Sequence, residues 1–196
     1  MIVYIFWHRP RPRTERARYE ALLAGFHQAL AASPPAGFRG SSCHRLAKLP
    51  WLGEGPGYED RYFLTGSEGL DPLDAAAVDV VRRSLHDSAA ELASTGAGGL
   101  YRRLREGRSE EGRAGEAWWL EKPPDVPYAE FLPRLEEWAP AGVQIWQRQM
   151  VLGPAPEFCL VGSAASLPPG RVPGEASVVR LTRTPVWPPV SPEAAG

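Results

Sequence analysis

The sequence has few cysteines and almost no net charge, and both shortages exclude classes of protein. Its 196 residues include two cysteines, Cys43 and Cys159, too few for a disulfide framework. They fall on predicted strands in different halves of the chain, so we expect buried free thiols and a reducing, cytoplasmic compartment. The net charge of −1 at pH 7 gives no overall field that attracts nucleic acid or an anionic membrane. The one local basic cluster, at residues 9–18, is interrupted by an acidic residue, so we expect neither partner.

Long apolar segments and several catalytic motifs are also absent. The apolar start at residues 1–7 is short and has no basic leader or cleavage site, which favours a first strand. The histidines lack His-x-x-x-His spacing and the cysteines lack Cys-x-x-Cys spacing, so no metal site is expected. Ser67 lacks the two flanking glycines of a nucleophile elbow. The glycine-rich run at 53–57 joins two predicted strands instead of opening a helix, so it predicts no phosphate-binding loop. We expect no cofactor.

The composition that remains is typical of an ordinary globular protein. Hydrophobic residues make up 43% and charged residues 23%, and this length suffices for one large domain or two small ones. The 20 glycines and 21 prolines indicate frequent turns. The seven tryptophans must fill a core or line a binding site.

Four blocks of the first half return in the same order in the second half. Residues 7–10 return at 120–123, residues 35–38 at 140–143, and residues 63–67 at 159–163. The helical stripe Tyr19, Leu22, Leu23, Phe26 returns as Tyr128, Phe131, Leu132, Leu135. Gene duplication explains this order better than chance does. The sequence therefore predicts one pseudo-symmetric fold built from two similar halves.

Hydrophobic periodicity predicts the elements of each half. In the first half we expect strands at 2–8, 38–46, 60–65 and 100–104 and helices at 14–32 and 71–94, the second helix ended by Gly96, Gly98 and Gly99. This is the order of a split βαβ, or ferredoxin-like, unit. In the second half we expect strands at 117–121, 143–151, 157–161 and 177–181 and a helix at 127–138, with no counterpart of the second helix. The predicted divisions are a first repeat at 1–104, a linker at 105–116, a reduced repeat at 117–182 and an extended tail at 183–196.

This element order, together with the duplication, resembles the dimeric α+β barrel superfamily, in which ferredoxin-like units pair sheet against sheet as two subunits or as a tandem fusion. Within it, EthD-like and antibiotic-biosynthesis-monooxygenase-like proteins are the most similar. The resemblance implies an α+β fold in which tandem ferredoxin-like repeats form a pseudo-dimeric barrel, the second repeat lacking its second helix. It also implies a cavity between sheet and helices that holds a small organic molecule, often without metal or flavin.

Alternation along the first strand predicts which of its side chains meet a ligand. Tyr4, Phe6 and His8 share one face, whereas the opposite face begins with aliphatic residues that suit packing against a helix. We therefore expect these three side chains to point into the barrel. The repeat register places Trp119 and Glu121 at positions equivalent to Phe6 and His8.

Three residues are candidates for acid and base chemistry. A histidine at position 8 exchanges protons near neutral pH, and an apolar pocket would raise the pKa of Glu121 toward that range. The alternative is that both residues sit at strand ends and face water. His44, on the second strand, is the third candidate, and the alternative, an edge strand with a wet face, is the one that its pattern favours.

The second half offers further candidates for binding the substrate. Gln147 and Gln149 occupy places equivalent to those of polar residues on the second strand, His44 among them. Their side chains could donate or accept a hydrogen bond with a substrate carbonyl or hydroxyl. Trp119 and Trp146 are candidate pocket walls, although large aromatic side chains at such places usually belong to a core.

These observations favour a small-molecule enzyme acting on a largely apolar or aromatic metabolite. Cofactor-independent oxygenation, cyclisation or decarboxylation, each with proton transfer in a barrel cavity, would suit the candidate residues. The alternative is a non-catalytic ligand-binding or accessory protein of the same fold. We expect a small-molecule ligand in either case, and a monomer or a homodimer.

Overall fold

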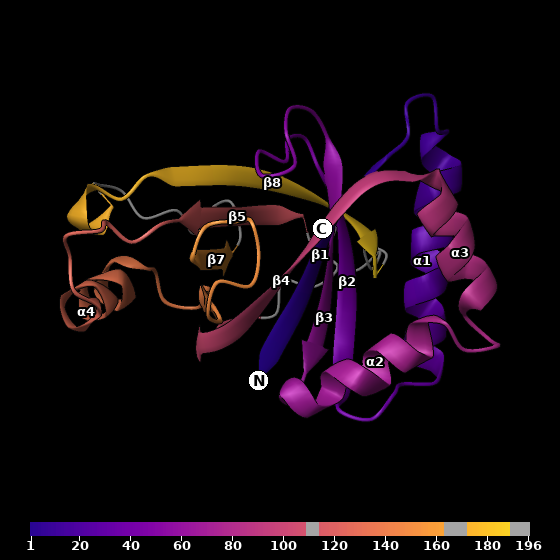
Figure 1. Cartoon of the computed structure of the whole chain (residues 1–196). Helices are drawn as coiled ribbons and strands as arrows, with labels where there is room; N and C mark the ends of the chain where they lie inside the picture. The colour runs from indigo at the N-terminus through magenta and orange to yellow at the C-terminus, as the bar shows by residue number, and fades with distance from the viewer. Residues whose placement is uncertain (109–113, 163–171, 189–196) are drawn as a thin grey trace, which may run out of the picture.

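The computed structural model describes residues 1–108, 114–162 and 172–188, which form a closed barrel of eight antiparallel strands with four α-helices outside it (Figure 1). The strands are β1 (Ile2–Pro10), β2 (Phe38–Leu46), β3 (Gly57–Leu64), β4 (Ala93–Arg105), β5 (Gly115–Leu120), β6 (Gln144–Arg148), β7 (Phe158–Gly162) and β8 (Val178–Trp187). The helices are α1 (Arg16–Ala32), α2 (Leu70–Ala77), α3 (Arg83–Leu92) and α4 (Tyr128–Trp138). Barrel and helices confirm the predicted mixed architecture at this level.

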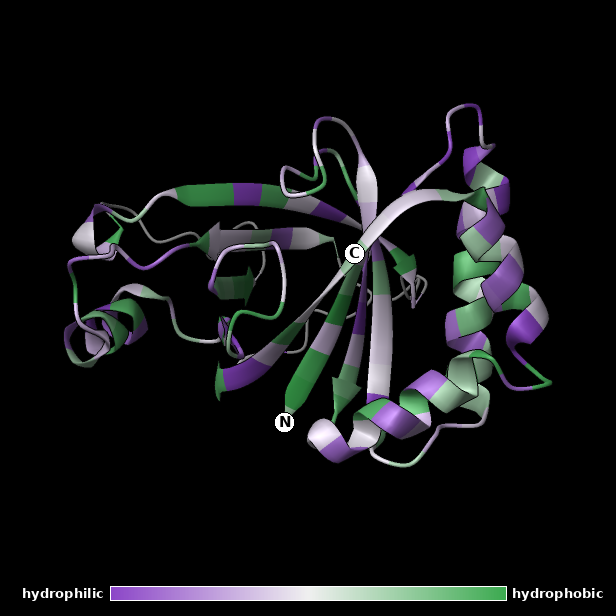
Figure 2. Ribbon diagram, viewed as in Figure 1, coloured by the Kyte–Doolittle hydropathy of each residue, from purple (hydrophilic) through white to green (hydrophobic). Residues whose placement is uncertain are grey.

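The order of strands around the barrel is β1-β3-β2-β8-β5-β7-β6-β4, with β4 pairing back to β1. Helices α1, α2 and α3 lie together beside the strands of the first half, and α4 lies beside the second half (Figure 1). Figure 2 shows β1 as a largely apolar strand, whereas α1 mixes hydrophilic and hydrophobic residues. Among the described residues, no helix combines the length and the apolar character needed to cross a membrane.

The helix predicted at 71–94 is two helices, α2 and α3. The side chain of Asp79 lies between them and accepts hydrogen bonds from the backbone N–H groups of Val81 (3.0 Å) and Arg82 (2.9 Å). An aspartate that bonds backbone donors two and three residues ahead favours a helix start over a helix interior. This turn at Asp79 separates α2 from α3, and hydrophobic periodicity does not detect it.

The glycines predicted to stop that helix lie inside β4. Gly96 and Gly98 are needed there because the aromatic side chains of β1 cross them closely. A methyl group added at Gly96 would lie 2.5 Å from Phe6 Cζ, and one added at Gly98 would lie 2.6 Å from the hydroxyl oxygen of Tyr4. Glycine at these positions therefore makes room for rings on the outer face of the sheet.

The end of the chain differs from the predicted tail. Strand β8 continues past residue 182, and Arg183 and Thr184 pair with Leu46 and Arg45 of β2 to close the barrel. The rest of that predicted tail, at 189–196, lies outside the described residues, as does part of the predicted linker, at 109–113.

The inside of the barrel is filled by side chains. Strand β1 presents to it the face opposite to the one predicted. Val3, Ile5 and Trp7 point inward, and Trp7 meets Trp119 with ring centroids 5.5 Å apart. Trp119 also points inward, whereas Phe6 lies on the outer face, so the predicted equivalence of Phe6 and Trp119 does not hold in the structure.

Charged groups also lie within this interior. Glu59 Oε2 accepts a hydrogen bond from Trp7 Nε1 (3.0 Å), and its Oε1 accepts one from Arg61 Nε (2.8 Å) and lies 3.3 Å from Arg183 Nε. Burial alone would raise the pKa of Glu59, but the two guanidinium groups hold it below its ordinary value. Ion pairing thus accounts for charges in a place where an unpaired charge would be costly.

The loop at 47–56 covers one end of the barrel. Trp51 packs edge-on against Trp7 and Trp119, with ring centroids 5.3 Å and 5.0 Å away. Arg9 Nη2 holds the loop by donating to the carbonyl oxygens of Gly53 (2.6 Å) and Gly55 (2.9 Å). With its interior packed and this end covered, the barrel is a core and not a chamber.

Candidate functional site

A cavity of about 570 Å³ lies outside the barrel, between the outer face of β1 and β3 and the three helices of the first half. This volume is within the range of roughly 300–1,000 Å³ found for sites of small organic ligands. Most of the wall is apolar or aromatic. The aromatic and imidazole side chains in the wall are those of Tyr4, Phe6, His8, Tyr19, Phe26, Tyr62 and His86.

A hydrogen-bonded chain of three side chains, Tyr19, His8 and Asp60, forms the polar part of the wall. His8 Nδ1 lies 2.7 Å from the Tyr19 hydroxyl, and His8 Nε2 lies 3.1 Å from Asp60 Oδ2. With His8 neutral, its Nε2–H donates to Asp60 and its Nδ1 accepts the Tyr19 O–H. This is the order of a catalytic triad, with a phenol in the place of the usual hydroxyl or thiol.

The neighbouring rings fix the orientation of the His8 imidazole. It stacks on Tyr58 with an interplanar angle of 10° and a centroid distance of 5.6 Å, and on Phe6 at 5.3 Å. The side chain of His8 is 2% exposed, so water does not compete freely for its nitrogens. The imidazole is thus held ready for one proton-transfer path.

Asp60 is shared by two histidines. His27 Nε2 lies 3.3 Å from Asp60 Oδ1, and His27 Nδ1 lies 2.7 Å from Ser41 Oγ. Burial would raise the pKa of Asp60, but His8 and His27 hold it well below its ordinary value. The carboxylate is therefore ionised at neutral pH and stabilises positive charge on either imidazole.

The phenol of Tyr19 stays protonated by contrast. Burial, followed by the negative charge of Asp60, raises its pKa above the ordinary value for tyrosine. A neutral phenol donates its hydrogen to His8 in the resting site and gives it up only when another proton replaces it.

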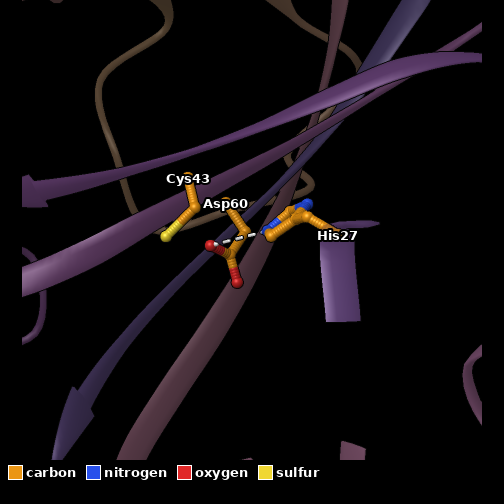
Figure 3. Close-up of side chains that lie close together, drawn as sticks. All are labelled: His27, Cys43 and Asp60. Carbon is orange, nitrogen blue, oxygen red and sulfur yellow. Dashed lines mark ion pairs between the residues drawn. The ribbon is translucent and has the colours of Figure 1, made fainter. Parts of the chain in front are cut away.

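Three of the buried groups also lie close enough to be tested as a metal site. His27, Cys43 and Asp60 each offer one ligand atom, and these atoms lie within 4.8 Å of one another (Figure 3). A metal would need the thiolate of Cys43, yet burial and the adjacent Asp60 raise the pKa of that thiol well above its ordinary value. The two oxygens of Asp60 are already directed at two imidazoles. The arrangement favours a carboxylate held between histidines over a metal centre.

Solved structures with a similar fold come from proteins with very different sequences. A candidate monooxygenase from Fusobacterium nucleatum subsp. nucleatum is 9% identical with a TM-score of 0.60, covering 94% of this chain and 92% of its own. One from Lactobacillus acidophilus is 9% identical with a TM-score of 0.55, covering 94% of each chain. An anthrone oxidase-like protein is 10% identical with a TM-score of 0.51, covering 93% of this chain and 91% of its own. No protein-family model and no curated protein matches the sequence.

The fold is similar to that of the dimeric α+β barrels, here closed within one chain. This confirms the resemblance predicted from element order, and at these identities the likeness concerns the fold alone. In this barrel the cavity lies between sheet and helices, as the resemblance implied.

Of the site residues predicted from sequence, three lie together in the cavity wall. Tyr4, Phe6 and His8 reach it from β1, although they do so on the outer face of the sheet and not inside the barrel. The prediction of direction fails because large inward side chains, Trp7 above all, fill the barrel. The grouping of the three follows from strand alternation and is unaffected by that error.

The other predicted residues lie outside the cavity wall. Trp119 and Trp146 are buried inside the barrel, where His44 Nδ1 lies 3.0 Å from Arg183 Nη2. Gln147 lies on the outside of the second half and accepts a hydrogen bond from Arg102 Nη2 (2.8 Å).

The last two are at the ends of strands in the second half. Glu121 has a half-exposed side chain that accepts a hydrogen bond from the backbone N–H of Glu157 (2.8 Å). Gln149 follows β6, and its backbone N–H donates to the carbonyl oxygen of Leu100 (2.7 Å). Glu121 and His8 are thus not brought together.

Three residues of the triad and its support were not singled out from sequence: Tyr19, His27 and Asp60. Two signals could have identified them. Tyr19 and His27 are eight residues apart on the apolar stripe of one helix, where a polar side chain needs a buried partner. Asp60 lies in a charged run within a strand that has a strand on each side, so its carboxylate also needs a partner.

Proposed function

We propose that this protein is an enzyme that removes a proton from a largely apolar or aromatic metabolite bound between β1 and helices α1–α3. The observation that carries the proposal is the Tyr19–His8–Asp60 chain, which borders an apolar cavity of about 570 Å³. In the proposed step the Tyr19 oxygen accepts the substrate proton while the Tyr19 hydrogen passes to His8 Nδ1. The carboxylate of Asp60 stabilises the resulting imidazolium.

We further propose that the deprotonated substrate reacts with molecular oxygen. The names of three structural neighbours, two candidate monooxygenases and an anthrone oxidase-like protein, support oxygenation over cyclisation or decarboxylation. A carbanion next to a carbonyl can supply the electrons itself: it reduces O₂ and forms a carbon-bound peroxide. Loss of water from that peroxide, with the proton returned by His8 through Tyr19, leaves one oxygen atom as a new carbonyl. One CH₂ group and one O₂ thus give one C=O and one H₂O.

Oxygen uptake with anthrone as a probe tests this function. We expect the wild-type protein, without added metal or flavin, to consume one O₂ per anthrone and to form anthraquinone. His8→Gln and Tyr19→Phe should each lower the rate by about a hundredfold or more, because each interrupts the proton path. Tyr128→Phe, an exposed tyrosine on α4, is the matched control and should keep the wild-type rate.

Two results would contradict the proposal. Oxygen uptake that survives both substitutions would mean that the triad is not the base. Binding of aromatic molecules without any turnover of a C–H acid would favour the non-catalytic ligand-binding protein instead.

We also infer that the two halves arose by duplication of one ferredoxin-like unit, with repeats near 1–104 and 117–182. The support is the strand order, which runs β4-β1-β3-β2 in the first half and β8-β5-β7-β6 in the second. Each half thus places its four strands in the same sequence, and each joins the other through its second strand. Because one chain closes the barrel, we propose a monomer, and light scattering after size-exclusion chromatography would distinguish it from a homodimer.

A further inference from the structure

The mouth of the cavity carries two carboxylates for which the proposed proton transfer has no use. Asp71 and Asp74 lie three residues apart on α2, so they share one face of the helix, and both border the cavity. In the part of the chain that the structure describes, neither side chain makes an ion pair or a hydrogen bond. Asp71 lies in the first turn of α2, where a carboxylate is favourable, whereas Asp74 lies beyond that turn and its charge repels that of Asp71 slightly.

The fully charged side chains of the cavity wall are all negative. Its described lining includes the carboxylates of Asp60, Asp71 and Asp74 and the imidazoles of His8 and His86, but neither lysine nor arginine. Asp60 is paired with His8 and His27, and His86 Nδ1 lies 3.0 Å from Asp87 Oδ1, so no described histidine of the wall pairs with Asp71 or Asp74. An anionic ligand would meet repulsion there, whereas a cationic group would find two exposed carboxylates.

The body of the cavity suits an aromatic ring system. Phe6, Phe26 and Tyr4 present rings to it, and ring faces attract both other rings and cations. The field of the mouth reaches this region, because burial first and then the charges of Asp60 and Asp74 raise the pKa of the Tyr4 hydroxyl. The polar and apolar parts of the wall therefore lie within the reach of one small molecule.

We propose that the natural ligand is an aromatic molecule bearing a protonated amine, with its ring system between β1 and α1 and its ammonium group at Asp71 and Asp74. This inference rests on the proposed function, because it names the substrate class of the same site. The acidic C–H bond of such a molecule would lie at the other end, toward Tyr19 and His8. The site would discriminate against carboxylates and phosphates of similar shape.

Binding of three naphthalene probes of nearly equal size tests the charge preference: naphthylmethylamine, naphthylmethanol and naphthoate. Affinities are measured by titration calorimetry in a buffer of low ionic strength with EDTA. We expect the amine to bind about tenfold more tightly than the alcohol, as two exposed ion pairs together would give, and the carboxylate to bind most weakly. Added salt should reduce the advantage of the amine and leave the alcohol unchanged.

Variants of the mouth locate the effect. In Asp71→Asn/Asp74→Asn the amine and the alcohol should bind about equally, with the affinity for the alcohol as in wild type. Glu91→Gln is the matched control, since it removes one exposed carboxylate of α3 that does not border the cavity. An amine advantage that persists in the double variant, or equal binding of all three probes to the wild type, would overturn the inference.

The proposed function and the substrate class fail separately. A wild-type protein that prefers the amine, loses this preference in the double variant and oxidises no C–H acid would refute the enzyme and support the ligand class. A protein that oxidises anthrone through Tyr19 but binds the amine no better than the alcohol would refute the ligand class and leave the enzyme in place.

Discussion

Adding one methyl group to β4 should push an aromatic ring into the cavity. A methyl at Gly98 would lie 2.6 Å from the Tyr4 hydroxyl oxygen, and one at Gly96 would lie 2.5 Å from Phe6 Cζ. Ordinary contact between such atoms is about 3.5–4.0 Å, so each ring must move by roughly 1 Å. Because β4 lies behind these rings, the direction open to them is toward the cavity. Gly98→Ala and Gly96→Ala should therefore narrow the binding site.

The substitutions should affect ligands more than folding. Overpacking costs about 1–3 kcal/mol in a closed core, but here the cavity can accept the displaced ring, and alanine gains roughly 0.5–1 kcal/mol over glycine in a strand. We expect each variant to be destabilised by no more than about 1–2 kcal/mol. A shift of about 1 Å in a binding site can lower turnover by as much as about a hundredfold.

The assay compares binding of naphthylmethanol, oxygen uptake with anthrone and urea unfolding in the same preparations. Gly25→Ala on α1 is the control, since its added methyl would lie 3.4 Å from Leu85 Cδ2, an ordinary contact, and should stabilise the helix by up to about 1 kcal/mol. If Gly98→Ala and Gly96→Ala bind the alcohol and consume oxygen as Gly25→Ala does, Tyr4 and Phe6 do not wall the site.

Three further outcomes are expected. Asp60→Asn should be less stable than wild type at pH 7 and should lose less stability than wild type on acidification. Folding lowers the pKa of Asp60, so its contribution to the free energy of unfolding is full above the unfolded pKa of about 4 and declines as the pH falls below that value. Urea midpoints of both proteins from pH 7 down to 3 measure the difference. Cys43 and Cys159 should not react with a thiol reagent at pH 8 until guanidinium unfolds the chain, because burial raises both pKa values, that of Cys159 to about 11; labelling of either in the native state would contradict their burial. Arg9→Ala should release the loop at 47–56 and lower stability by about 1–3 kcal/mol, measured by urea unfolding with tryptophan fluorescence, and an unchanged midpoint would show that its carbonyl contacts do not hold the loop.

The fold could be predicted because it depends on local patterns. Apolar stripes and β-branched runs gave the order of helices and strands, and the order alone indicates ferredoxin-like units. The helix break at Asp79 could not be predicted in the same way, since it coincides with a turn held by hydrogen bonds of one side chain. The glycines of β4 misled for a related reason: their role is to make room for rings on another strand, which periodicity does not reveal.

The site was less predictable because its parts come from distant segments. His8 was singled out by its own chemistry, but its partners Tyr19 and Asp60 come from a helix and from another strand. The choice of face rested on the aliphatic residues of the opposite face of β1, which fill the barrel instead of packing against a helix, so Tyr4 and Phe6 were assigned to the wrong side. Long-range contacts of this kind need coordinates.

The two outer walls of the barrel have opposite consequences for change. Around α4 the space corresponding to the cavity is solid, with Phe131 and Leu135 packed against Leu120 and Phe158. A substitution there therefore affects the stability of the fold and not a binding site. Residues that line the cavity can therefore change ligand binding, whereas residues packed under α4 contribute to stability. Selection can act on binding and on stability at separate positions.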